Sequence, residues 1–142
     1  MSFLSLVLLA GCGGNPADYP ETAPVTGTVT LDGAPLEGAS INFVPATGRS
    51  SSGKTDAQGR YELHYTGTIE GAMLGPHRVM IWKEVPDPDY VLSEAERKAM
   101  EEGEFFLPLV HALPKRYRGQ DSRLSAEVKD TNNVIDFALT SQ

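Results

Sequence analysis

Apolar and polar residues alternate along most of the chain, and this alternation predicts a protein built of short β-strands. In residues 25–31 (VTGTVTL), Val25, Val29 and Leu31 lie on one face and threonines lie on the other. The same period of two recurs in residues 39–45, 60–66, 75–82, 124–129 and 134–139. A period of two with β-branched residues is typical of half-buried strands. With a short edge strand expected at 51–55, about seven strands with frequent turns predict an all-β sandwich.

Two of the predicted turns contain an aspartate followed by a glycine. Asp32 and Gly33 follow the first strand, and Asp56 and Gly59 precede the strand at 60–66. Glycine adopts positive φ without steric cost, and an aspartate side chain can accept hydrogen bonds from nearby backbone N–H groups. We therefore assign these four residues structural roles in turns. A lone Asp-x-x-Gly does not supply the six to eight oxygen ligands that calcium takes, so we expect no metal there.

Residues 84–120 form the longest stretch without a strand pattern. Ser93 and Glu96 have the spacing of a capping box, which predicts a helix over residues 94–102 that ends at Gly103. We therefore expect a short helical insertion between the strands of the sandwich.

The strand at 75–82 is apolar on both faces, because Met80 and Trp82 lie opposite the predicted core positions. A strand of this kind needs apolar cover on both sides. The apolar run at 105–110 (FFLPLV) lies within the insertion. We expect this run to pack over Met80 and Trp82.

The net charge of the chain is −7, and most of it lies in the insertion. Residues 84–104 contain eight acidic and two basic side chains, so the rest of the chain is nearly neutral. Affinity for nucleic acids depends largely on neutralising phosphates, and an acidic chain is poorly suited to this. We therefore expect no nucleic-acid partner.

Residues 1–10 (MSFLSLVLLA) are apolar and uncharged, and they precede the single cysteine, Cys12. This length matches the apolar region of a signal peptide and is too short to span a bilayer. Leu9-Ala10-Gly11-Cys12 resembles the bacterial lipobox. The resemblance implies that the leader is removed before Cys12, and that the cysteine is lipidated and holds the protein on a membrane of the cell envelope, facing the periplasm or the exterior.

The chain is thus expected to have three parts. Residues 1–11 are a lipoprotein signal peptide, and residues 12–24 are the lipidated cysteine and a flexible tether rich in glycine and proline. Residues 25–142 form a single domain, with the acidic insertion at about 84–120.

Three segments, GTVTLDGAPLEGASINFVP, GKTDAQGRYEL and GPHRVMI, resemble the carboxypeptidase-regulatory-like domain. This domain is a transthyretin-like (prealbumin-like) β-sandwich, and the resemblance covers residues 25–81. It implies the fold and leaves the chemistry open, because function depends on sites and not on the fold.

Residues 115–118 (Lys115, Arg116, Tyr117 and Arg118) form a compact basic patch with one aromatic ring. They are candidates for contact with an anionic headgroup, a glycan or another partner. The alternative is that they pair with the acidic insertion or face the solvent.

No arrangement of residues in the sequence predicts catalysis. The Gly-x-Ser-x-Gly motif of hydrolases is absent, and the single cysteine leaves no cluster for zinc. We therefore expect a non-catalytic binding or structural module without a cofactor, acting through protein or glycan contacts. One alternative is a hydrolase of the hydroxyisourate type, because residues 117–120 (YRGQ) resemble its Tyr-Arg-Gly-Ser ending, with Gln120 in place of serine. The other alternative is an accessory domain of an envelope complex.

Overall fold

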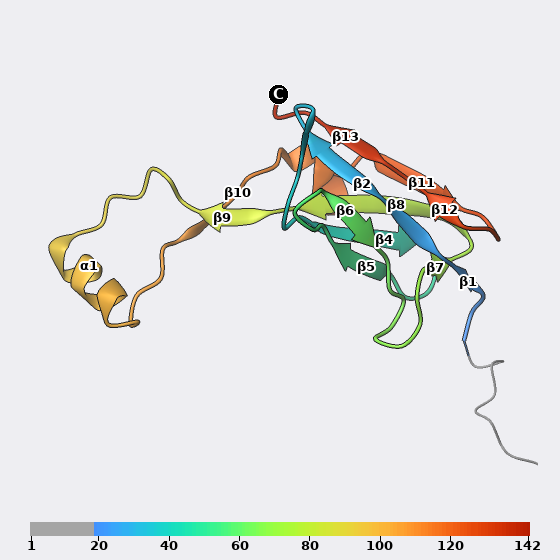
Figure 1. Cartoon of the computed structure of the whole chain (residues 1–142), viewed down its shortest axis with the longest axis horizontal. Coiled ribbons are helices and arrows are strands. Elements are labelled where there is room, and N and C mark those ends of the chain that lie inside the picture. The colour runs from blue at the N-terminus through green and yellow to red at the C-terminus, as the bar shows by residue number, and fades with distance from the viewer. Residues whose placement is uncertain (1–18) are drawn as a thin grey trace, which may run out of the picture.

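The computed structural model describes residues 19–142, and these form a β-sandwich, as predicted (Figure 1). The first sheet is antiparallel, with strand order β11-β8-β4-β5. Its strands are β11 (Leu124–Val128), β8 (Gly75–Trp82), β4 (Ser40–Pro45) and β5 (Ser51–Lys54). The one α-helix in residues 19–142 lies in the insertion, so the prediction of an all-β fold with a short helical insertion is confirmed.

The second sheet is built around β2 (Val25–Leu31). On one edge β2 pairs antiparallel with β3 (Ala34–Pro35) and β6 (Arg60–Glu62). On the other edge it pairs in parallel with β12 (Asn133–Val134) and β13 (Phe137–Leu139). The chain therefore crosses from one sheet to the other between β11 and β12. Asn133 holds this crossing, since its side-chain amide donates to the carbonyls of Lys129 (2.9 Å) and Pro24 (3.1 Å).

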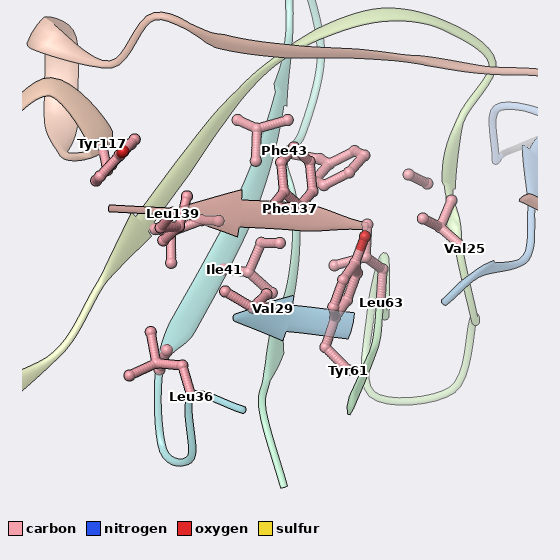
Figure 2. Packing of buried hydrophobic residues seen from close by; sticks show 14 of the residues in the cluster. Val25, Val29, Leu36, Ile41, Phe43, Tyr61, Leu63, Tyr117, Phe137 and Leu139 are labelled. Atoms are coloured by element: carbon pink, nitrogen blue, oxygen red, sulfur yellow. The ribbon is translucent and has the colours of Figure 1, made fainter. Parts of the chain in front are cut away.

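The core lies between the two sheets and consists of the side chains that the alternation places inward (Figure 2). The largest fully buried apolar side chains are Val25, Val29, Ile41, Phe43, Leu63, Val79, Ile81, Val128 and Leu139. Because burial on one face requires a period of two along each strand, the core could be read from the sequence.

Aromatic rings join the two halves of the core. The Phe43 ring meets the Phe137 ring edge-on, with centroids 6.2 Å apart, and Tyr61 lies 6.4 Å from Phe137. The Tyr61 hydroxyl donates a hydrogen bond of 2.6 Å to the Ile135 carbonyl. Burial, with a smaller contribution from the negative charge of Asp136, raises the pKa of Tyr61, so this hydroxyl remains a donor.

The turn residues lie where the sequence places them. Asp32 and Gly33 both have positive φ (52° and 85°), as in the two-residue turn that joins right-twisted strands. Asp56 accepts hydrogen bonds of 2.9 Å from the backbone of Gln58 and Arg60, within the turn that ends at Gly59.

Strand pairing begins before Val25. β1 (Thr22–Ala23) pairs with β7 (Ala72–Met73), and Ala23 is buried in the core cluster. Part of the expected tether is therefore sheet structure. Cys12, the expected signal peptide and the first part of the expected tether lie outside the described residues.

The insertion forms an arm, residues 84–111, that projects from one end of the sandwich (Figure 1). It consists of a two-stranded ribbon, β9 (Glu84–Pro86) and β10 (Leu109–His111), and helix α1 (Glu94–Glu101). The structure has the expected capping box between Ser93 and Glu96. No helix in residues 19–142 has the length and apolar character needed to cross a membrane.

The expectation that residues 105–110 cover Met80 and Trp82 is wrong. The ribbon carries these residues away from the sheet, and Phe106 and Leu109 remain 82% and 59% exposed. The segment that returns from the arm packs against the sandwich instead, through Leu113 and Tyr117, which are both buried in the core cluster.

Candidate functional site

The arm is held together by its own local contacts. The Tyr90 and Phe105 rings stack with centroids 6.2 Å apart, and the Tyr90 hydroxyl donates to the Glu96 carboxylate (2.7 Å). Ser93 also donates to Glu96, from its hydroxyl (2.7 Å) and its backbone N–H (2.8 Å). These bonds, those from Ser93 first, lower the pKa of Glu96. The carboxylate of Glu96 therefore organises the outer part of the arm.

The arm exposes large apolar side chains to solvent. Val91 is 87% exposed and Phe106 is 82% exposed, and helix α1 buries none of its residues. Phe106 also lines an apolar pocket of about 340 Å³, together with Pro86, Met100, Phe105, Leu107 and Leu109. We refer to Val91, Met100, Phe106 and Leu109 as the apolar patch of the arm. Large exposed apolar side chains that gather on one segment, with Met100, Phe106 and Leu109 lining the same pocket, indicate an interaction site.

The segment that carries most of the apolar patch is rich in acidic side chains. Residues 84–104 contain eight acidic and two basic residues. The structure of residues 19–142 records no salt bridge for any of these acidic groups. The arm thus combines an apolar patch with a strong negative charge.

A second pocket, of about 310 Å³, lies where the arm joins the sandwich, and we refer to it as the root pocket. It is lined by Trp82, His111, Lys115, Arg118, Gly119 and Asp121. Trp82 comes from the end of β8, and His111 comes from the end of β10. The other four come from two short 3-10 helices, η2 (Lys115–Tyr117) and η3 (Gly119–Asp121), and from the residue between them.

The four residues of the basic patch expected at 115–118 do not form one surface, because their side chains lie in different surroundings. Lys115 and Arg118 line the root pocket, whereas Tyr117 is buried in the core cluster. Arg116 turns toward the last strand, where its Nη2 donates to the carbonyl (2.7 Å) and the hydroxyl (2.8 Å) of Thr140. The Arg116 guanidinium also lies 4.7 Å from the centre of the Tyr117 ring. Arg116 and Tyr117 therefore serve the closure of the sandwich.

Tyr117 itself receives hydrogen bonds. Its hydroxyl accepts from the Thr140 backbone N–H at 3.0 Å. Burial raises the pKa of Tyr117, but the bonds from Thr140 and the nearby Arg116 outweigh burial, and the net pKa is lowered.

Other hollows lie elsewhere on the sandwich. One of them, of about 490 Å³, is open and lies over β2 and β6. Its Asp56 carboxylate and Arg60 guanidinium pair with each other at 3.7 Å. In the part of the chain that the structure describes, no three His, Cys, Asp or Glu side chains gather where they could bind a metal.

The histidines are dispersed among different surroundings. His64 lines a polar hollow near Ser52, His77 is buried against Phe43, and His111 lines the root pocket. Burial lowers the pKa of His77, partly opposed by a hydrogen bond of its Nδ1 to the Gly75 carbonyl. The strand pairing thus gathers no histidine cluster beside Tyr117.

Sequence reasoning missed both the root pocket and the apolar patch. The outward-facing Trp82 was the available signal for the pocket, since a tryptophan that is not fully buried and lies next to cationic side chains suggests a ligand surface. For the patch, the signal was an apolar run that follows a short, mostly charged helix.

Compared with protein-family models, with curated proteins and with solved structures, the chain matched none of them.

Proposed function

We propose that this protein is a lipid-anchored, non-catalytic binding module of the cell envelope, and that its arm holds a partner protein. The observation that carries the proposal is the apolar patch, because the arm exposes large side chains that contribute nothing to the core. Leaving such side chains in water forgoes about 1.5–3 kcal/mol for each one that a partner could bury.

The charge of the arm defines the chemistry of the partner. Eight acidic side chains on the same arm as the apolar patch favour a partner surface that combines apolar groups with lysine and arginine. Charge complementarity of this kind raises the rate of association and falls with salt.

The position of the arm also supports this role. β1, which follows the leader, lies at the opposite end of the sandwich from the arm (Figure 1). Nine residues separate Cys12 from Thr22, and they can span at most about 3.5 Å each. A lipid on Cys12 would therefore hold the β1 end near the membrane and leave the arm free to meet a neighbouring envelope protein.

Affinity capture from detergent-solubilised membranes tests the arm. The tagged full chain is compared with a Val91→Ser/Phe106→Ser variant and with a matched control, Val134→Ser, which removes a side chain that is 73% exposed on β12 of the sandwich. We expect the double variant to recover at least tenfold less partner, since buried apolar anchors dominate interfaces. The control should recover as much as the wild type, and recovery should fall as salt rises.

An unchanged set of captured proteins in the double variant would refute the arm as the binding surface. The anchor is tested separately by cell fractionation of Cys12→Ser. This variant should move from the membrane fraction to the soluble fraction. If it stayed equally membrane-bound, the lipid anchor would be wrong and the arm would be unaffected.

A further inference from the structure

The root pocket holds two cationic side chains that are not paired within the described residues. Lys115 is exposed and Arg118 is half-buried, and neither makes a salt bridge or a side-chain hydrogen bond in residues 19–142. The Arg118 Nε is itself buried without a hydrogen-bond partner there. The rest of the half-buried guanidinium lines the pocket, and a charge-assisted hydrogen bond from it to a carboxylate is stronger than a neutral one, so an anion that reaches Arg118 would bind favourably.

Trp82 gives the same pocket a flat apolar surface. It is the only tryptophan in the chain and lies half-buried at the end of β8. An indole ring packs well against a second flat or weakly polar ring, while its N–H stays available for hydrogen bonding. The pocket volume, about 310 Å³, is at the small end of ligand sites and suits a ligand of about one ring.

Asp121 limits the charge and the type of the ligand. Lys115, Arg118 and Asp121 together leave one net positive charge in the pocket, which one carboxylate would balance. A ligand with several phosphate charges would meet repulsion from Asp121. Hydroxyl groups, in contrast, would donate hydrogen bonds to the Asp121 carboxylate, which only accepts.

We propose that the root pocket binds a sugar acid, a pyranose ring that carries a carboxylate. The carboxylate pairs with Lys115 and Arg118, the ring packs on Trp82, and ring hydroxyls donate to Asp121. The site is distinct from the apolar patch and does not depend on the partner of the arm.

Intrinsic fluorescence tests the proposal without a label, because all tryptophan emission comes from Trp82. The full chain in non-ionic detergent is titrated at constant ionic strength with glucuronate and galacturonate, and with glucose and acetate as the separate parts of the ligand. We expect a saturable change with at least one sugar acid, with a Kd on the order of 1 mM for a single ring. Glucose and acetate should each bind at least tenfold more weakly.

Variants identify the residues. Lys115→Gln and Arg118→Gln should each weaken sugar-acid binding at least tenfold. Arg78→Gln removes the same charge from the same strand as Trp82 but from outside the root pocket, so it should bind like the wild type. Thermal melts of each variant show that the fold is retained, and the exposed Lys115 provides a test even if Arg118→Gln proves unstable.

Three results would overturn the proposal. The first is the absence of a saturable signal with either sugar acid. The second is acetate binding as tightly as the sugar acids, which would reduce the pocket to a simple anion site. The third is an equal loss of binding in Arg78→Gln and Lys115→Gln. The arm variant Val91→Ser/Phe106→Ser should bind sugar acids normally, so failure of this site and failure of the arm are distinguishable.

Discussion

Gly27 lies in the middle of β2, where the chain leaves no room for a side chain. A β-carbon added there would lie 2.6 Å from the carbonyl carbon of Ile135 and 2.8 Å from Cε1 of Tyr61, and closer still to the Ile135 carbonyl oxygen. Ordinary contacts begin at 3.4 Å, so Gly27→Ala must move the backbone at Ile135 by about 0.8 Å or more. We therefore predict that this single methyl group is strongly destabilising.

The magnitude follows from the hydrogen bonds that such a movement disturbs. Tyr61 donates to the Ile135 carbonyl (2.6 Å), Ile135 N–H donates to the Thr26 carbonyl (2.8 Å), and Thr28 N–H donates to the Asp136 carboxylate (2.8 Å). At about 1 kcal/mol each, their loss costs about 3 kcal/mol. For a domain of this size that corresponds to a fall in Tm of about 10 °C or more.

The assay is thermal unfolding followed by circular dichroism, with Gly67→Ala as the matched control. Gly67 has no atom within 4 Å of an added β-carbon and no positive φ. Its replacement should leave Tm unchanged or raise it slightly, because alanine restricts the unfolded chain. If Gly27→Ala melted within 2 °C of Gly67→Ala, the packing of β2 against residues 133–139 would be wrong. The 2 °C threshold corresponds to the about 0.5 kcal/mol that ordinary surface substitutions cost.

Three further predictions concern the arm, the buried histidine and the closing strand. Replacing residues 88–107 with an Asn-Gly turn should leave Tm, measured by calorimetry, unchanged or slightly raised, since no side chain of this segment belongs to the core cluster. A fall of Tm by 10 °C would show instead that the arm supports the fold. Burial lowers the pKa of His77, so protonation opposes folding: stability should be full above the ordinary pKa of about 6.5 and should fall below it, with a slope of at most about 1.4 kcal/mol per pH unit. Urea unfolding between pH 7.5 and 5.5 should show this fall in the free energy of unfolding for the wild type and a smaller fall for His77→Phe. Equal falls in the two proteins would contradict the role of His77. Tyr117→Ala should cost about 3–5 kcal/mol and Arg116→Ala about 1 kcal/mol by urea unfolding, and the reverse order would contradict their placement.

The strands and the core could be predicted from the sequence because burial of one face imposes a local rule. Val25, Val29, Ile41 and Phe43 alternate with polar residues, and each is fully buried. The short helix was also predictable, since the capping box of Ser93 and Glu96 is a local interaction. In both cases residues close in sequence decide the structure.

The pairing of the last strands could not be predicted in the same way. β12 and β13 have an alternating pattern, but the pattern is the same for a parallel and an antiparallel neighbour. Their parallel pairing with β2 joins residues more than a hundred positions apart, as in the hydrogen bond from the Asn133 side chain to the Pro24 carbonyl. No spacing in the sequence reports a contact of this kind.

The apolar patch and the root pocket were still less predictable from the sequence. The apolar run around Phe106 could cover Trp82 or remain on the arm, and the choice depends on where the ribbon of β9 and β10 points. The root pocket combines Trp82 with Lys115 and Arg118 from the far side of the insertion. Local patterns show that such residues exist and do not show which of them meet.

The central claim is that the arm meets a partner protein in the cell. It is tested most directly by site-specific photo-crosslinking, with a benzophenone-bearing amino acid placed at position 106 of the arm and, separately, at position 134 of the sandwich. These positions have similar exposure, 82% and 73%. Illumination of intact cells should give one discrete crosslinked protein from position 106 and none from position 134. Crosslinking from neither position, or the same product from both, would contradict the claim.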